Sequence, residues 1–186
     1  MQSKIILAGL MITALLGCNN LSLGQEIEKV NADLVLSNIA NYKNSKIEIH
    51  GYIVHVCGVD GKKMKLKTEN GEIIKLVSND STLKFDSQYH RKNVCVQGKI
   101  NETRIEKQTI DNFEKEKTLL CHIDKTPCKD KKWVENQIKN GSSDSLSQKD
   151  IKALKEKMQK TGKNYVSIFT LVAEKISIID EEKKRL

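Results

Sequence analysis

The chain has 186 residues, a formal net charge of +8, 38% hydrophobic residues and five cysteines. This length and apolar content suffice for one domain with its own core, and they exclude an intrinsically disordered chain and a large two-domain enzyme. The longest apolar run is N-terminal and too short for a convincing membrane-spanning helix, which excludes a polytopic membrane protein.

The N-terminus predicts export from the cell. Lys4 precedes a mainly apolar stretch that ends in the small residues Gly17 and Cys18. A positive start, a short apolar run and small residues at its end are the parts of a secretory signal peptide. We therefore expect residues 1–17 to be a signal peptide that the mature protein lacks.

The residues Leu15-Leu16-Gly17-Cys18 resemble the lipobox of bacterial lipoproteins. In a lipobox the cysteine thiol receives a diacylglyceryl group and the cysteine becomes the first residue of the mature chain. The resemblance therefore implies that Cys18 is lipidated and that the protein is a membrane-anchored lipoprotein of the bacterial cell envelope. The small residues up to Gly24 also fit ordinary cleavage before Gln25, which predicts a secreted or periplasmic soluble protein instead.

The polar residues 18–30 have no periodic pattern, and we expect them to tether one domain that covers residues 31–180. A short helix is predicted at the start of this domain, because apolar residues between Asn31 and Tyr42 follow helical spacing. A charged tail is expected at residues 181–186.

The first predicted strand runs from Lys46 to Cys57. Its side chains alternate strictly, so the pattern places His55 and Cys57 on the same face as Ile53. A glycine in the middle of such a long strand, Gly51, predicts a sharp bend of the kind found at barrel corners.

The rest of the domain is predicted to contain four more strands, interrupted by a charged helical insert at about residues 103–161. Thr126 with Pro127 predicts the start of one insert helix, and Ser147 with Asp150 predicts a capping box for another. The lysines of the second strand predict a solvated face or a strand edge. The four strands are residues 63–68, 72–77, 93–100 and 165–173, the last continuing to residue 179.

This order of elements predicts an α+β fold that is mainly β. Four consecutive strands, a bend at a glycine in the first of them and a fifth strand after a helical insert are typical of an OB-fold, a five-stranded Greek-key barrel. We expect an N-terminal helix before the barrel and the α-helical insert between strands 4 and 5. A generic antiparallel sheet packed by helices is the alternative.

Several motifs of the chain resemble those of one protein group. A strand ending in His-x-Cys precedes a Gly-Lys-Lys hairpin between Lys46 and Met64, residues 94–98 have the form Val-x-Val-x-Gly, and a Gly-Lys-x-Tyr-x-Ser motif lies at residues 162–167. The helix at Asp33-Leu34 matches loosely. The chain resembles exported bacterial OB-fold proteins and lipoproteins of unassigned biochemistry. The resemblance covers most of the mature chain; it implies the OB-fold and export, and it implies no activity.

Four cysteines remain after the lipobox, and an exported protein can use them in two ways. A Cys121–Cys128 disulfide is the first expectation, with the other cysteines buried as small apolar residues. The alternative is a metal site in which His55 and Cys57, two residues apart, form a half-site that Cys121, His122 and Cys128 complete. Thiolate and imidazole are the ligands that Zn(II) or Cu(I) prefers, so zinc or copper is the possible cofactor.

The functional prediction is a non-enzymatic binding module for an envelope protein, a glycan or a small ligand, with metal or thiol handling as the alternative. No catalytic motif is found in the sequence. Nucleic acid is not an expected partner, because the second and third strands offer no aromatic side chains on which bases could stack. Thiol chemistry is favoured if Cys128 lies in the first turn of a helix, where free N–H groups stabilise a thiolate.

Overall fold

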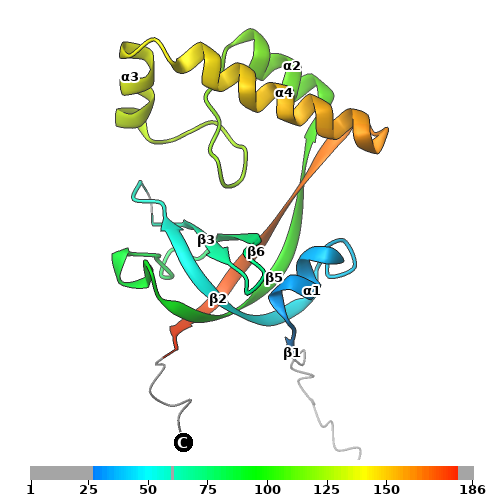
Figure 1. Ribbon diagram of the computed structural model, residues 1–186, viewed down its shortest axis with the longest axis vertical. Helices are drawn as coiled ribbons and strands as arrows, with labels where there is room; N and C mark the ends of the chain where they lie inside the picture. Colours follow the sequence, from blue (N-terminus) through cyan, green and yellow to red (C-terminus); the bar gives the residue numbers. More distant parts are fainter. Residues whose placement is uncertain (1–26, 60, 180–186) are drawn as a thin grey trace, which may run out of the picture.

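The computed structural model describes residues 27–59 and 61–179 (Figure 1). Within these residues six strands form one mixed sheet, and four α-helices are present. The predicted α+β class is therefore confirmed, but the sheet has six strands rather than the predicted five. The predicted signal peptide, Cys18 and the predicted charged tail lie outside the described residues. The elements are β1 (Glu28–Lys29), α1 (Ala32–Ser37), β2 (Lys46–Val56), β3 (Lys63–Lys67), β4 (Ile73–Val77), a 3-10 turn (Ser87–Tyr89), β5 (Asn93–Glu106), α2 (Lys107–Lys115), α3 (Lys131–Lys139), α4 (Ser143–Thr161) and β6 (Tyr165–Ile178).

The additional strand is β1, a two-residue strand inside the segment that was predicted to be a tether. It pairs in parallel with β2, with Glu28 opposite Ile47 and Lys29 opposite Glu48. The described part of that segment is thus joined to the sheet by backbone pairing, and α1 follows it directly. The side chain of Asn31 caps α1 by accepting from the backbone N–H groups of Asp33 and Leu34.

The strands are paired in a ring. β2 pairs with β3, β3 with β4, β4 with β6 and β6 with β5, and β5 pairs in turn with β2. The contact between β4 and β6 is parallel, with Leu76 opposite Leu171, and the other four are antiparallel. β2 exchanges partners at Tyr52, where its pairing with β5 ends and its pairing with β3 begins.

Gly51 lies beside this exchange point. A Cβ atom at residue 51 would collide with the side chain of Leu66 and lie 2.8 Å from the carbonyl oxygen of Lys67. Glycine therefore lets β2 approach β3 closely while it turns away from β5, and Figure 1 shows β2 as a strongly curved strand. The bend predicted at Gly51 is confirmed.

The apolar residues form two cores. The larger core fills the inside of the sheet, with α1 packed against it. β5 and β6 continue beyond the rest of the sheet as a long two-stranded ladder and carry residues 107–161, which we call the insert (Figure 1). The insert has a smaller core of its own, built from Ile105, Ile110, Leu120, Ile151, Leu154, Val166 and Ile168.

Two helix starts in the insert differ from the prediction. α3 begins at Lys131, where the side chain of Asp130 accepts from the N–H of Trp133, and not at Thr126. α4 begins at Ser143, so Ser147 is a buried residue inside the helix rather than a cap. α4 ends at Gly162, which takes the left-handed conformation with φ 65°. None of the helices in the described part of the chain is long and apolar enough to cross a membrane.

A β-bulge in β2 changes the face on which His55 lies. The register against β3 shifts between Ile53 and His55, so that Ile53 faces Leu66 but His55 faces Lys65. Beyond the shift Val56, not His55, packs against the core. The prediction that His55 and Cys57 share the face of Ile53 is therefore wrong, because one extra residue in the strand reverses the alternation.

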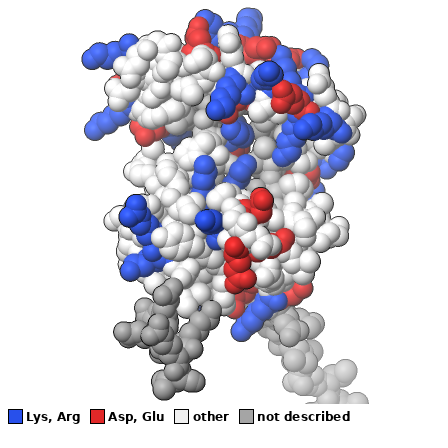
Figure 2. All heavy atoms as spheres, viewed as in Figure 1, with Lys and Arg blue, Asp and Glu red and all other residues white. Residues whose placement is uncertain are grey.

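Charges of both signs cover the insert. On the face seen in Figure 2, Lys and Arg side chains gather over the helices, with Asp and Glu side chains interspersed among them. Four ion pairs link residues of the insert to one another: Lys107–Asp111, Lys117–Asp144, Lys125–Asp150 and Lys155–Glu114. The charges on this surface of the insert are thus mixed and solvated, as charges in such patterns usually are.

Candidate functional site at the sheet–insert junction

Two segments that are far apart in the sequence meet where the insert lies over the sheet. His55 and Cys57 lie at the end of β2, whereas Cys121, His122 and Cys128 lie in the loop between α2 and α3. The rings of His55 and His122 are in edge-on contact, with 4.7 Å between their centroids and 72° between their planes. We call these five residues, which are the metal ligands predicted from the sequence, the junction cluster.

The loop that carries three of these residues folds back on itself like a hairpin. Leu120 and Pro127 form an antiparallel bridge, and the N–H of Cys128 donates to the carbonyl of Leu119 at 2.8 Å. The N–H of Cys121 donates to the carbonyl of Thr126 at 2.7 Å. Cys121 and Cys128 therefore lie on neighbouring arms of one tight loop. Cys128 precedes α3 and is not in a helical first turn, so the expected thiolate stabilisation by a helix start is wrong.

An ion pair from β3 holds this loop against the sheet. The ammonium of Lys63 lies 2.8 Å from Asp124 and 3.8 Å from the sulfur of Cys121, and both charged side chains are largely buried. Burial alone would raise the pKa of Asp124, but hydrogen bonds from Lys63 and Thr126 more than offset it and hold that pKa below its ordinary value. On its other side the loop is tied to α4 by the Lys125–Asp150 pair at 2.9 Å.

Lys63 and Lys65 of β3 are not part of the solvated row or strand edge that the sequence predicts, whereas Lys67 is exposed. β3 is paired on both sides, and the bulge places His55, Lys65 and Lys75 side by side across β2, β3 and β4. Burial lowers the pKa of Lys65 and of Lys75, and the nearby ammonium of Lys125 lowers both further. Neither ammonium has a carboxylate within 4.0 Å among the described residues. The junction is therefore a partly dry region with excess positive charge.

Both imidazoles of the junction cluster are neutral at neutral pH. Burial lowers the pKa of His122 to about 4, and the neighbouring Lys65 and His55 contribute to the shift. Burial also lowers the pKa of His55, again with a contribution from Lys65. The Nε2 atom of His55 is buried and has no hydrogen-bond partner in the described structure. A buried imidazole nitrogen of this kind is rare in folded proteins and is free to act as an acceptor or a metal ligand.

The four described cysteines are free thiols. The Cys121–Cys128 bond is therefore not formed here, and it stays a prediction for the oxidised protein. Burial raises the pKa of Cys128, and the negative charges that Cys121 and Cys57 would carry raise it further. Cys128 is thus near enough to Cys121 and to Cys57 for charge on either sulfur to disfavour its own ionisation. Such repulsion is relieved when a cation binds between the groups.

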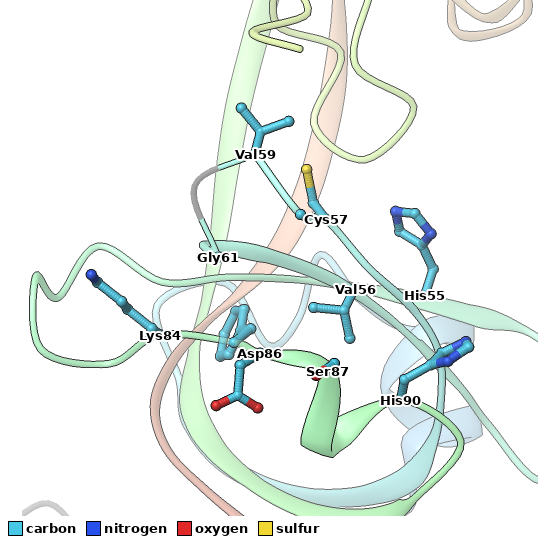
Figure 3. Close-up of a pocket in the computed structure, with 11 residues that line it drawn as sticks. His55, Val56, Cys57, Val59, Gly61, Lys84, Asp86, Ser87 and His90 are labelled. Atoms are coloured by element: carbon cyan, nitrogen blue, oxygen red, sulfur yellow. The ribbon is translucent and has the colours of Figure 1, made fainter. Parts of the chain in front are cut away.

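A groove of about 670 Å³ leads to the junction cluster from the side of the β2–β3 turn. Figure 3 shows Cys57 at its rim with the sulfur directed toward the loop of the insert, and His55 and His90 with their rings on one side of the groove. Lys84 lies on the opposite side, and Phe85 is also among the residues that line the groove. The groove gives a small ligand access to His55 and Cys57.

The junction cluster is not drawn together as tightly as a coordination sphere. Within residues 27–59 and 61–179, one group of three brings its ligand atoms all within 4.8 Å of one another, and it consists of Glu48, His50 and Cys95. The sequence analysis missed this group. Strand alternation could have placed Glu48 and His50 on one face, but the register that sets Cys95 opposite His50 comes only from the structure.

Comparison with known proteins gives no family assignment. No protein-family model matches the chain, and no curated protein is similar to it in sequence. The functional argument therefore depends on the geometry described above.

Proposed function

We propose that this chain is an exported, lipid-anchored binding module of the bacterial cell envelope, built on an OB-fold barrel, that binds one Zn(II) or Cu(I) ion at the sheet–insert junction. The observation that carries the proposal is the buried, unpartnered Nε2 atom of His55, in a cluster with His122 and three free thiols. In this proposal the protein holds or delivers the metal and catalyses no reaction.

The ring of strand pairings supports the OB-fold part of the proposal. Within the ring each of the five strands β2 to β6 has two partners, and the order of pairing returns from β5 to β2. A first strand curved at Gly51, one parallel contact between β4 and β6, and an insertion between β5 and β6 agree with a Greek-key barrel of five strands. In this description β1 is an appendage to the barrel.

The N-terminal sequence supports export and anchoring. A charged start, an apolar run and the lipobox-like residues before Cys18 are the features on which this part of the proposal depends. A lipid anchor at Cys18 places the metal site in the cell envelope. A short segment then separates the anchor from β1, where the chain joins the sheet.

The chemistry of the junction cluster supports a soft or borderline metal. Neutral imidazoles are ready to coordinate, whereas protonated ones would repel a cation. Thiols release their protons on binding, and the ammonium groups of Lys63, Lys65 and Lys125 then offset the negative charge of several thiolates. Sulfur ligands select Zn(II) and Cu(I) over Mg(II) and Ca(II), which require oxygen.

Elemental analysis of the purified mature protein tests the proposal. We expect one equivalent of zinc or copper to be bound at the junction. We expect Cys57→Ser and Cys121→Ser each to remove this equivalent. Leu34→Ala is the control, because this exposed side chain of α1 is not a member of the junction cluster. Metal content unchanged in both junction variants contradicts the proposal, and the module would then bind an organic ligand instead.

A further inference from the structure

Glu48, His50 and Cys95 lie together on the outer face of the sheet. Glu48 and His50 are two residues apart in β2, and His50 is directly opposite Cys95 of β5. Their neighbours Ile47, Ile49 and Val96 point the other way, into the core. Two paired strands therefore hold the three side chains on one rigid surface, separate from the junction cluster.

The spacing of these groups is close to that of a metal site. All three ligand atoms lie within 4.8 Å of one another, and Nε2 of His50 is 3.8 Å from Oε1 of Glu48. Ligands at about 2.0–2.3 Å from a tetrahedral zinc ion are separated from each other by about 3.3–3.8 Å. Small side-chain rotations are enough to close the group around an ion, because the backbone positions already match.

Gln97 orients the carboxylate of Glu48. Its amide nitrogen donates to Oε2 of Glu48 at 2.7 Å, which leaves Oε1 directed toward His50. This hydrogen bond holds the pKa of Glu48 below its ordinary value, so the group is ionised at neutral pH. Lys29 is the competing cation at 3.8 Å, but its side chain is 82% exposed and such pairs contribute little. A hydrogen bond to the second carboxylate oxygen is the usual support of a metal-ligating carboxylate.

We propose that Glu48, His50 and Cys95 form a second metal site, which binds Zn(II) through three protein ligands and leaves one position open to solvent. The mixed oxygen, nitrogen and sulfur donors suit Zn(II) and exclude Mg(II) and Ca(II) as preferred ions. His50 is well exposed, so the open position faces the outside of the molecule. On binding, the Cys95 thiol releases its proton to solvent water, and the S–H bond is replaced by a bond from the thiolate sulfur to the metal.

A cobalt titration of the full chain tests this site, with Co(II) as the probe for Zn(II). In a variant with Cys18, Cys57, Cys121 and Cys128 replaced by serine, Cys95 is the sole remaining cysteine. We expect this variant to bind one equivalent of Co(II), with the absorption of a tetrahedral ion and of a thiolate ligand, and we expect Zn(II) to displace the Co(II).

His50→Gln and Glu48→Gln should each weaken Co(II) binding at least about tenfold, and Gln97→Leu should weaken it by about tenfold. His90→Gln, an exposed histidine outside the group, is the control. The proposal is wrong if no thiolate absorption develops, or if the His50 and Glu48 variants bind as tightly as their parent.

Zinc stoichiometry in the chain with all its cysteines separates this proposal from the proposed function, and it does not depend on the multiple variant folding. With both sites present, two equivalents bind; Cys95→Ser removes one and Cys57→Ser removes the other. A single equivalent that only Cys57→Ser removes contradicts the second site and leaves the junction site standing. A single equivalent that only Cys95→Ser removes contradicts the junction site and leaves the second site standing.

Discussion

Gly51 is the residue that allows β2 to leave β5 and approach β3. We predict that Gly51→Ala destabilises the protein by about 2 kcal/mol or more, because the new methyl group overlaps Leu66 in a packed core. Urea denaturation measures the loss. Gly58→Ala is the matched control, since no atom lies within 4 Å of the added Cβ at that position. Equal stabilities of the two variants would show that β2 does not pass as close to β3 as described.

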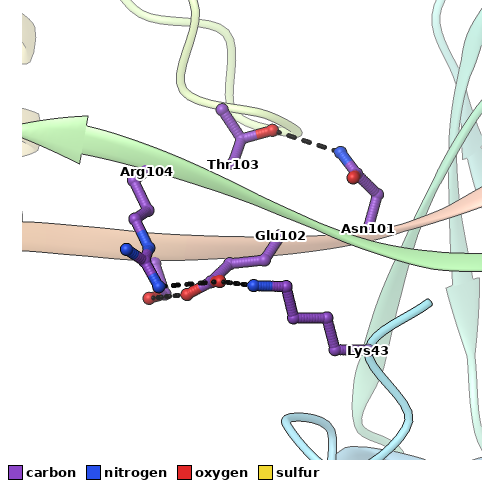
Figure 4. Close-up of polar contacts among 6 residues, drawn as sticks. Lys43, Asn101, Glu102, Thr103 and Arg104 are labelled. Carbon is purple, nitrogen blue, oxygen red and sulfur yellow. Dashed lines mark hydrogen bonds and ion pairs between the residues drawn. The ribbon is translucent and has the colours of Figure 1, made fainter.

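Glu102 on β5 is the acceptor of several charged and polar groups (Figure 4). Its side chain is 8% exposed and receives Lys43 at 2.6 Å, Ser167 at 2.6 Å and Arg104 at 3.5 Å. The hydrogen bonds from Lys43 and Ser167 lower the pKa of Glu102 from 4.5 to about 2. The folded protein therefore favours the ionised carboxylate more strongly than the unfolded chain does.

The sign of this shift predicts a pH dependence of stability. A carboxylate with a depressed pKa stabilises the fold above pH 4.5, and that contribution is lost as the pH falls toward 2. We predict that Glu102→Gln lowers the free energy of unfolding by about 1–2 kcal/mol at pH 7 and has little effect near pH 2. Denaturant titrations at several pH values check it. A constant difference across this range would mean that Glu102 acts through packing alone.

At the scale of elements, the insert has a core that is distinct from that of the sheet. Ile110 of α2 is fully buried in this core, which includes only the far ends of β5 and β6. We predict that Ile110→Ala costs about 2–4 kcal/mol and accelerates hydrogen exchange in α2 and α4 more than in β2 and β3. Ile138→Ala in α3 is the control, because that side chain is 62% exposed. Uniform acceleration throughout the chain would show a single cooperative unit.

Most of the strands were predictable from sequence, whereas the two-residue β1, the extension of β5 to Glu106 and the bulge were not. Alternation and Gly-containing turns locate β2, β3 and β4 to within a residue or two, because these signals are local. The reversal at His55 depends on how β2 pairs with β3, and a period-two pattern carries no mark of one extra residue. The same local rules predict a helix start at Thr126-Pro127. In the structure Pro127 forms a bridge with Leu120 across the loop, and no helix begins there.

Part of the candidate site was also predictable from local features of the sequence. The cysteine and histidine residue types pointed to His55, Cys57, Cys121 and Cys128, and the fold does bring His55 against the loop that carries the last two. The sequence placed Lys63 and Lys65 in solvent, because nothing local shows that the insert covers β3. Tertiary contacts determine both the charge of the junction and the pairing of His50 with Cys95.

At the scale of the whole molecule, the first question is where the protein is held. We predict that the native protein sediments with the membrane fraction and that Cys18→Ala releases it into the soluble fraction, because the lipid anchor is lost. Cys57→Ala controls for the loss of a thiol as such and should stay with the membrane. Retention of the Cys18→Ala protein in the membrane would remove the lipoprotein proposal.

The junction metal site is the central claim, and anomalous diffraction from crystals grown with Zn(II) tests it most directly. We expect an anomalous peak between β2 and the loop of the insert, at about 2.0–2.3 Å from Nε2 of His55 and from at least two of the sulfurs of Cys57, Cys121 and Cys128. Crystals with no peak at this place, or with His55 and these sulfurs more than 4 Å from every bound zinc ion, would contradict the account.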